Sequence, residues 1–244
     1  MCIRDRTYQM YPLAQDRKNY AIFIPIDYHS PKQNETLQVY YTKNKENFEE
    51  VLFVTVVDGD YKQNEIITVP KSQVTLSLKN KEKTADEYAL VYGKVYSKIT
   101  PKDLTSKTPF ILPLQSKITS EYGNARVYNN TVKSYHIGVA FQAKIGDPIV
   151  ATNNGKVVLV MERFYLGQVI YLDHGWGAYS YYAHLSEVLV QEGDYVKRGD
   201  IIAKSGNTGR VTGPHLHYAL RLHNTTVDPL QYGELYNSFL LENL

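Results

Sequence analysis

Two histidines near the C-terminal end of the chain have the spacing that most directly suggests chemistry. His215 and His217 stand two residues apart, just before the apolar run Tyr218–Leu220. On a β-strand, residues i and i+2 point to the same face, roughly 6 to 7 Å apart, and Leu216 would then point into a core. Two such imidazoles could ligate one metal ion, or one could ligate while the other acts on bound water. The spacing equally suits two surface histidines on a half-exposed strand, and a short motif alone does not separate these alternatives.

The other histidines and the cysteine content limit the kind of metal site that the chain could build. Cys2 is the only cysteine, which excludes an intramolecular disulfide and a cysteine-rich zinc site. Any transition metal would therefore be held by His, Asp or Glu. His136 and His184 lie in strand-like segments, where a lone histidine is commonly a hydrogen-bonded structural residue. We expect the remaining histidines to be structural or exposed: His29, His174 and His223.

The elements that must position these histidines are short strands separated by glycine-containing turns. From Phe110 onward β-rich runs recur, and twelve of the 15 glycines lie between Gly123 and Gly213. That density is typical of tight hairpins and bulges rather than of helices. We therefore predict an antiparallel β domain over residues 109–232, followed by a tail over residues 233–244 that could be helical.

The N-terminal part of the chain is also rich in β-forming residues. Runs of Ile, Val, Phe, Thr and Tyr separated by turn residues predict a small β-sandwich-like accessory domain over residues 19–80. The runs are 21–28, 36–40, 51–57, 66–69 and 74–78. We expect the fold class to be mainly β.

A helix and a polar linker are predicted between the two β regions, over residues 81–108. Thr84 and Glu87 fit a capping box, and apolar residues recur at helical spacing from Tyr88 to Val95. The polar stretch Ser97–Thr108 is typical of a linker. We therefore place a domain boundary near residue 100.

Many segments of the C-terminal half occur in the order found in one peptidase family. Tyr135–Phe141 contains a His-x-Gly element, and Thr212–His217 contains Gly-Pro-His-Leu-His. The pattern continues in Ile118–Gly123, Gly146–Ala151, Gly155–Val157, Asp173–Gly175, Tyr182–Ser186, Gly193–Gly199 and Gly206–Arg210. From Leu112 to Tyr232 the chain thus resembles LytM-type (M23) peptidoglycan metallopeptidases. The N-terminal β module resembles, far less specifically, the accessory domain of some periplasmic members.

The resemblance implies a zinc site and a hydrolytic role for the histidines. In the family, zinc is held by a first His, by an Asp four residues later and by the second His of His-Leu-His. These map onto His136, position 140 and His217. Three protein ligands leave one coordination position for the water that hydrolysis requires. The family's two other histidines map onto His184 and His215, which would orient or deprotonate the water and stabilise the oxyanion.

Position 140 departs from the family pattern because it is Ala140, whose methyl group cannot coordinate zinc. Four-ligand structural sites bind zinc with roughly 10–16 kcal/mol, so losing one ligand is expected to weaken affinity about a hundredfold or more. Asp147 falls in a hairpin position of the family pattern, where we do not expect it to reach the metal. A milder departure is Ala125, followed by Arg126, at a position where many members have Arg.

Three explanations of Ala140 stay open. It could be a natural change that leaves a degenerate domain, which binds peptidoglycan or scaffolds or activates another cell-wall hydrolase or a homologous subunit. It could have been introduced to trap an inactive enzyme. Alternatively, His136 and His217 could hold zinc weakly with an extra water. The leading expectation is a zinc endopeptidase that cuts peptide cross-links or stems of peptidoglycan and is impaired by the missing ligand.

Composition and charge also limit which other classes of protein the chain could belong to. With 21% charged residues and a net charge of +2, the chain has no long basic block that would indicate nucleic-acid binding. No run approaches 18 apolar residues, so no membrane span is expected. No signal peptide is visible, and residues 1–6 (MCIRDR) resemble a sequencing-adapter artefact, so we expect the natural N-terminus upstream. A periplasmic or cell-envelope location is implied by the resemblance alone.

Overall fold

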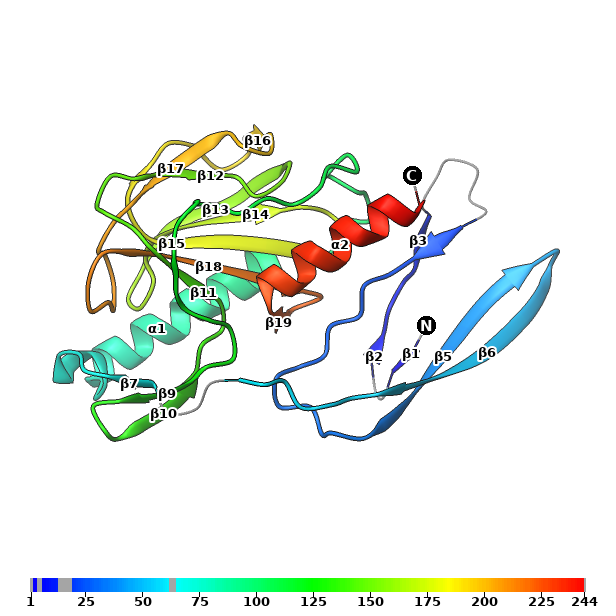
Figure 1. Cartoon of the computed structure of the whole chain (residues 1–244), viewed down its shortest axis with the longest axis horizontal. Coiled ribbons are helices and arrows are strands. Elements are labelled where there is room, and N and C mark those ends of the chain that lie inside the picture. Colours follow the sequence, from blue (N-terminus) through cyan, green and yellow to red (C-terminus); the bar gives the residue numbers. More distant parts are fainter. Residues whose placement is uncertain (1, 4–5, 13–18, 62–64, 244) are drawn as a thin grey trace. The chain divides into compact units, whose positions relative to one another are not determined.

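A computed structural model describes residues 2–3, 6–12, 19–61 and 65–243 (Figure 1). The chain divides into two compact units, Met1–Asp60 and Tyr61–Leu244. The boundary expected near residue 100 lies inside the second unit. Residues 1, 4 and 5 of the expected artefact segment lie outside the described residues.

The first unit is built around a long hairpin. β5 (Asn34–Lys43) and β6 (Glu46–Thr55) pair antiparallel over their whole lengths. Both residues of the connection, Asn44 and Lys45, have positive φ, as a type I′ hairpin turn requires. The short strands β1 (Cys2–Ile3) and β2 (Arg6–Thr7) complete a sheet of order β2-β1-β5-β6. β3 (Tyr11–Pro12) and β4 (Tyr20–Ala21) form a separate ladder.

Two of the predicted N-terminal strands differ in the structure. The run 21–28 keeps only the end of β4, and Pro25 within it lacks the N–H that a ladder requires. The run 74–78 forms a helix start, where Ser77 Oγ accepts a hydrogen bond from Asn80 N at 3.2 Å. The other three runs overlap β5, β6 and β7 (Glu65–Ile67). The prediction of a mainly β chain with a C-terminal antiparallel domain is confirmed.

A ten-stranded antiparallel sheet dominates the second unit. Its main path is β16-β13-β14-β15-β18-β11-β8, and β12, β17 and β19 pair with one another or with its members. The strands are β8 (Ile118–Ser120), β11 (Val139–Gln142), β12 (Pro148–Val150), β13 (Gly155–Arg163), β14 (Gly167–Asp173), β15 (Ala178–Val188), β16 (Tyr195–Val196), β17 (Ile201–Ser205), β18 (His215–Leu222) and β19 (Thr225–Val227). A three-stranded sheet of order β10-β9-β7 contains β9 (Ala125–Tyr128) and β10 (Val132–Tyr135).

The helix of the second unit begins earlier than predicted. A short 3-10 turn, η1 (Lys71–Gln73), precedes α1 (Leu78–Val91), which continues into one π-helical segment, η2 (Tyr92–Tyr96). The predicted capping box is wrong: Thr84 lies within α1 and its Oγ1 donates to Lys81 O at 2.9 Å. A threonine inside a helix can satisfy its hydroxyl on a preceding carbonyl, so Thr-x-x-Glu does not by itself mark a helix start.

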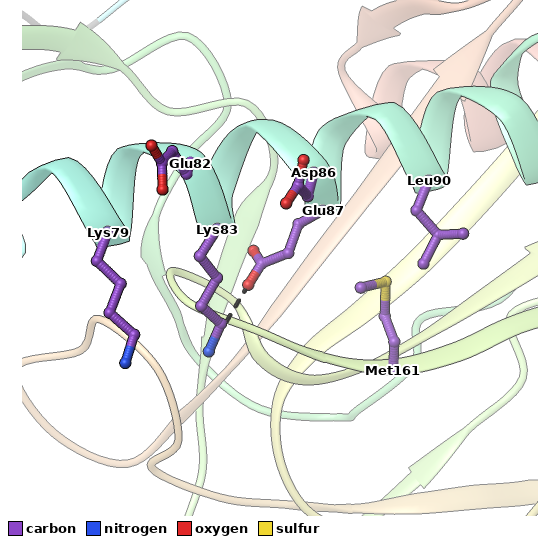
Figure 2. A pocket seen from close by; sticks show the side chains of 7 residues that line it. All are labelled: Lys79, Glu82, Lys83, Asp86, Glu87, Leu90 and Met161. Carbon is purple, nitrogen blue, oxygen red and sulfur yellow. Dashed lines mark ion pairs between the residues drawn. The ribbon is translucent and has the colours of Figure 1, made fainter.

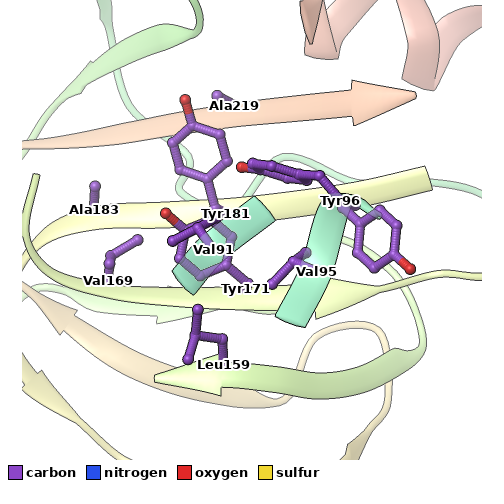
Figure 3. Packing of buried hydrophobic residues seen from close by; sticks show 10 residues of the cluster. Val91, Val95, Tyr96, Leu159, Val169, Tyr171, Tyr181, Ala183 and Ala219 are labelled. Carbon is purple, nitrogen blue, oxygen red and sulfur yellow. The ribbon is translucent and has the colours of Figure 1, made fainter. Parts of the chain in front are cut away.

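The helical segment packs on the large sheet through one apolar stripe. Val91 and Val95, four residues apart and therefore on one helical face, meet Leu159, Tyr171 and Tyr181 of the sheet (Figure 3). Val91 and Val95 are no more than 1% exposed. This core fixes β13, β14 and β15, the last of which carries one of the candidate histidines.

The stretch predicted as a linker is fastened to the second unit. Trp176 N donates to Thr100 O at 2.8 Å, and Leu104 N donates to His174 O at 3.0 Å. The C-terminal helix, α2 (Pro229–Asn243), begins before the predicted tail, with Pro229 as its first residue. Asp228 Oδ1 accepts from Leu230 N at 2.9 Å at its start. Within the described part of the chain, no helix is long and apolar enough to cross a membrane.

Candidate metal centre

His217 lies in a row of small side chains that crosses neighbouring strands. In the antiparallel register, Ser120 is opposite Ala140, Ala140 is opposite His217, and His217 is opposite Ala183. Directly opposed residues on neighbouring strands point to the same face of a sheet. The small neighbours therefore leave room for the imidazole ring and place the side chain of position 140 beside it. As predicted, the alternating Leu216 is buried, with 0% exposure.

His136 approaches His217 from the segment between β10 and β11. His136 Nε2 lies 3.0 Å from His217 Nδ1, and the two residues are only 2% and 5% exposed. His136 Nδ1 donates to Glu121 O at 2.9 Å, because a carbonyl oxygen can only accept. In the neutral ring, Nε2 is then unprotonated and faces His217. Two nitrogens bound to one tetrahedral zinc ion at 2.0–2.1 Å would be about 3.3 Å apart, close to the observed distance.

Gly138 permits this approach. A Cβ at position 138 would lie 2.5 Å from Tyr218 O and 2.8 Å from His217 Cε1. Real Cβ atoms do not tolerate such distances from backbone atoms. The glycine of the His-x-Gly element is therefore required by the close packing of this segment against β18.

His184 and His215 form a second pair beside the first. Their ring centroids are 4.7 Å apart, and His184 is 5.9 Å from His217. His184 has φ 64° at the point where β15 leaves β18 and begins to pair with β17. His184 Nδ1 donates to Thr208 O at 2.8 Å, and His215 Nδ1 donates to Gly213 O at 2.9 Å. Each neutral ring therefore has an unprotonated Nε2. The structure thus brings together all four histidines singled out from the sequence.

Burial favours the neutral form of all four imidazoles. Desolvation is the largest cause of a lowered pKa at each of them; it lowers the pKa of His184 to about 3 and those of His136 and His217 well below the usual value. The Arg126 cation lowers the pKa of every member of the group further. Neutral imidazole is the form that binds a metal or accepts a proton.

These residues fit a metal ion only in part. His136 and His217 offer converging nitrogens, but Ala140 places a buried methyl group where the third ligand is expected. Across the described residues, no group of three or more His, Cys, Asp and Glu side chains is arranged to hold a metal ion. Asp147 does not compensate, since its Oδ2 accepts from Lys144 N at 2.7 Å within its own turn.

The second nitrogen of His217 is a further weakness of the metal site. His217 Nε2 is buried and, within the part of the chain that is described, has no hydrogen-bond partner. A metal-bound imidazole normally donates its other N–H to a carboxylate, carbonyl or water. His136 meets this condition through Glu121 O, whereas His217 does not.

The remaining histidines take the places expected for structural or exposed residues. His174 is 1% exposed, its Nδ1 donates to Asn154 O at 2.8 Å, and its Nε2 accepts from Ser180 Oγ at 2.7 Å. His29 is exposed, and His223 is half-buried.

One polar contact of the site was missed by sequence reasoning. Ser120 Oγ lies 3.1 Å from His136 Nδ1 and donates to Glu65 Oε2 at 3.0 Å. Arg126 donates to both, from Nε to Glu65 at 2.8 Å and from Nη2 to Ser120 at 2.8 Å. Glu65 lies on β7, distant in sequence from the histidines, and no local pattern marks it. Only the parallel pairing of β7 with β9 brings it to this place.

A cavity beside α1 is not part of the histidine site. It measures about 470 Å³ and is lined by Lys79, Glu82, Lys83, Asp86, Glu87, Leu90 and Met161 (Figure 2). Most of these side chains are charged, and Lys83 pairs with Glu87 across 3.9 Å. None of the four histidines lines it, so the candidate chemistry lies elsewhere.

Comparison with known proteins places the histidine site within one family. Residues 134–229 match peptidase family M23. The chain is 38% identical over 116 residues to peptidoglycan DD-endopeptidase ShyB of Vibrio cholerae, covering 47% of this chain and 27% of that protein. It is 37% identical over 124 residues to an uncharacterized metalloprotease of Buchnera aphidicola, covering 50% of this chain and 32% of that protein. The matched region thus spans less than a third of either relative.

A solved structure extends the similarity of fold beyond the matched residues. A crystal structure from Pseudomonas aeruginosa assigned to peptidase M23 aligns with a TM-score of 0.66 at 23% identity, covering 94% of this chain and 83% of the other. At that identity the likeness shows a shared fold. Taken with the family match, it supports one conclusion: residues 134–229 of this chain form a domain of peptidase family M23.

Proposed function

We propose that the M23 domain is a zinc-dependent endopeptidase acting on the peptide part of bacterial peptidoglycan, and that Ala140 holds its activity low. The observation that carries the proposal is the convergence of four imidazoles, three of them with Nδ1 bonded to a backbone carbonyl. Burying polar rings costs desolvation free energy, and apolar residues at the same positions would avoid this cost. A purely structural domain would gain nothing from the cluster.

Each histidine has a definite role in this proposal. His136 Nε2 and His217 Nδ1 are the atoms that would hold zinc. A zinc ion bound there would supply a polarised water whose pKa is lowered toward neutrality. Either His184 or His215, each unprotonated at Nε2, would accept the proton of that water. The ring that takes the proton would then donate a hydrogen bond to the oxyanion that forms on the peptide carbonyl.

The substrate class is carried over from a relative. ShyB is named a peptidoglycan DD-endopeptidase, and this chain is 38% identical to it over the matched region. We extend that substrate class to this chain as peptide cross-links or stems of the cell wall. The place of action would then be the periplasm or cell envelope.

Ala140 favours a second function, that of a degenerate domain. Its methyl group is 4% exposed and lies opposite His217, where a carboxylate would complete the metal site. A domain unable to hold zinc would bind peptidoglycan peptides without cutting them. It would then serve as a scaffold or activator of another cell-wall hydrolase.

Digestion of purified sacculi separates the two functions. The chain, Ala140→Asp and Ala140→Asn would be incubated with sacculi under saturating zinc, and soluble muropeptides measured. The endopeptidase proposal expects release by Ala140→Asp above that of the chain, whereas Ala140→Asn, equal in size but neutral, gives no gain. No release by Ala140→Asp would refute the endopeptidase. Sacculus binding without release would then favour the degenerate domain, and loss of binding as well would exclude it.

A further inference from the structure

We propose that Glu65 is a positioning residue for His136, supplied by a strand outside the residues matched to family M23. Glu65 lies on β7, whereas the family match begins at residue 134. β7 runs parallel to β9 with Glu65 directly opposite Arg126. The backbone pairing therefore fixes where the carboxylate stands. The proposal concerns the orientation of His136 and rests on the proposed function only where metal affinity is used to test it.

The donors and acceptors of the contact determine its direction. Glu65 Oε2, a carboxylate oxygen, can only accept, so the single hydroxyl proton of Ser120 points to Glu65 at 3.0 Å. Ser120 Oγ is then left with lone pairs, one of which accepts from Arg126 Nη2 at 2.8 Å. The other lone pair of Ser120 Oγ accepts from His136 Nδ1–H, whose nitrogen is 3.1 Å away. Ser120 Oγ is thus a second acceptor for this N–H, beside Glu121 O. Glu65 thereby favours the tautomer of His136 that leaves Nε2 unprotonated toward His217.

The same carboxylate balances a nearby cation. Arg126 Nε donates to Glu65 Oε2 at 2.8 Å, and the two side chains are 16% and 27% exposed. The Arg126 charge reaches all four histidines, where it lowers their pKa. A cation so placed also opposes the binding of a second cation. Position 140 carries no charge because it is alanine. Glu65 supplies a negative charge that is connected to His136 through the Ser120 hydroxyl.

Removal of Glu65 has two expected consequences. In Glu65→Leu, which has a similar length but no acceptor, the Ser120 hydroxyl proton loses its partner and can then point at His136 Nδ1. That hydrogen bond favours the other tautomer, with the proton on Nε2, where the metal would bind. In addition, Arg126 loses its counter-charge. Loss of a group that orients a metal ligand typically lowers metal affinity 10–100-fold.

The test compares three substitutions in the full chain: Glu65→Leu, Ser120→Ala and, as a control at another ion pair, Glu187→Leu. Glu187 also lies on a strand and pairs with a cation, Lys204 Nζ at 2.7 Å, with 51% and 44% of their side chains exposed. The first measurement is the ring ¹⁵N spectrum of His136 in the metal-free protein. We expect Glu65→Leu and Ser120→Ala to shift the His136 nitrogens, while Glu187→Leu leaves them unchanged.

The second measurement is zinc affinity by calorimetry in the Ala140→Asp background. Glu65→Leu is expected to lower the zinc affinity 10–100-fold, and to lower it less when Ser120 is already alanine, because Ser120 carries the contact. The Tm of Glu65→Leu should stay within a few degrees of that of the control. Unchanged His136 nitrogens would overturn the proposal, whatever the zinc affinity.

The two measurements separate this inference from the proposed function. The ¹⁵N spectrum requires no metal, so it decides the role of Glu65 even when no variant binds zinc. Shifted His136 nitrogens in a protein that never cuts sacculi would keep Glu65 as a positioning residue and reject the endopeptidase. Unshifted His136 nitrogens in a protein that cuts sacculi would reject Glu65 as a positioning residue and keep the endopeptidase.

Discussion

The two histidine pairs of the site depend on different parts of the chain. In the pair His184–His215, both rings are oriented by backbone carbonyl oxygens, those of Thr208 and Gly213. A carbonyl is present whatever side chain occupies its position, so substitution does not remove it. In the pair His136–His217, only His136 has such a contact, with the Glu121 carbonyl, and the residue opposite His217 is Ala140. Backbone carbonyl groups thus orient three of the four rings, whereas the His217 ring, among the described residues, has its hydrogen bond with His136 alone.

Gly138→Ala is expected to have the largest effect on the pair His136–His217. The added Cβ meets Tyr218 O at 2.5 Å and Ala219 Cβ at 2.7 Å, so the segment that carries His136 must move away from β18. We expect a loss of about 3 kcal/mol in the free energy of unfolding, the upper end of the usual cost of overpacking. Urea unfolding measures it. Gly213→Ala is the matched control, because nothing lies within 4 Å of its Cβ position. Equal stability of the two variants would contradict the account.

His174 extends the comparison to a buried histidine outside the site. Burial lowers its pKa to about 4 from 6.5, so the unfolded chain takes up a proton first as pH falls. Protonation of His174 therefore leaves the free energy of unfolding unchanged above pH 6.5 and lowers it progressively as the pH falls from 6.5 to 4. The shift corresponds to roughly 3 kcal/mol.

The measurement is the free energy of unfolding between pH 7 and pH 4 for the chain and for His174→Gln. Glutamine has a donor and an acceptor but does not titrate. We expect the chain to lose up to about 3 kcal/mol more than the variant over this range. Parallel pH profiles would show that His174 is not held neutral by burial.

Thr208→Val would test whether the backbone-held pair depends on its loop. Thr208 Oγ1 donates to Leu185 O at 2.9 Å and accepts from Gln168 N at 3.1 Å, which fixes the carbonyl that orients His184. Valine has the same shape without the hydroxyl, so we expect a loss of about 2 kcal/mol in stability. The ring ¹⁵N resonances of His184 should change as well. Thr208→Ser, which keeps the hydroxyl, should preserve them; if valine preserves them too, the loop is not what orients His184.

Arg210→Lys carries the smallest expected effect. The Arg210 guanidinium lies 4.1 Å from the ring centroid of Tyr128 and 4.2 Å from that of Tyr165. Lysine keeps the charge but loses the planar group that stacks on both rings, at a cost of about 1 kcal/mol. For a domain of this size that corresponds to a fall in Tm of roughly 2–4 °C, measured by thermal unfolding. An unchanged Tm would mean that this contact does not help to hold the loop of Thr208.

One part of the histidine cluster could be predicted from local spacing, whereas the inclusion of His136 and His184 depended on the family resemblance. The spacing of His215 and His217 places both rings on one face of β18 with Leu216 buried between them. The steric need for Gly138 emerges only in the structure, where the backbone of β18 leaves no room for a Cβ. Ala140 was identified from its place in the family pattern, and its position opposite His217 follows from the strand register.

The features that could not be predicted depend on contacts between distant segments. Glu65 reaches the site only through the parallel pairing of β7 with β9. The supposed linker is polar, and composition does not reveal that its backbone bonds to residues 174 and 176. The helix begins earlier than the Thr-x-x-Glu pattern indicates, because Ser77 accepts from the free N–H of Asn80, whereas Thr84 lies inside the helix and donates to Lys81 O.

Zinc affinity tests the central claim most directly. Calorimetry and metal analysis would compare the chain with Ala140→Asp and with Ala140→Asn, which adds the same volume without charge. The account predicts that the zinc affinity of Ala140→Asp is higher than that of the chain by a factor of about a hundred or more, while the affinity of Ala140→Asn is little changed. Stoichiometric zinc in the chain itself, with an affinity equal to that of Ala140→Asp, would contradict it.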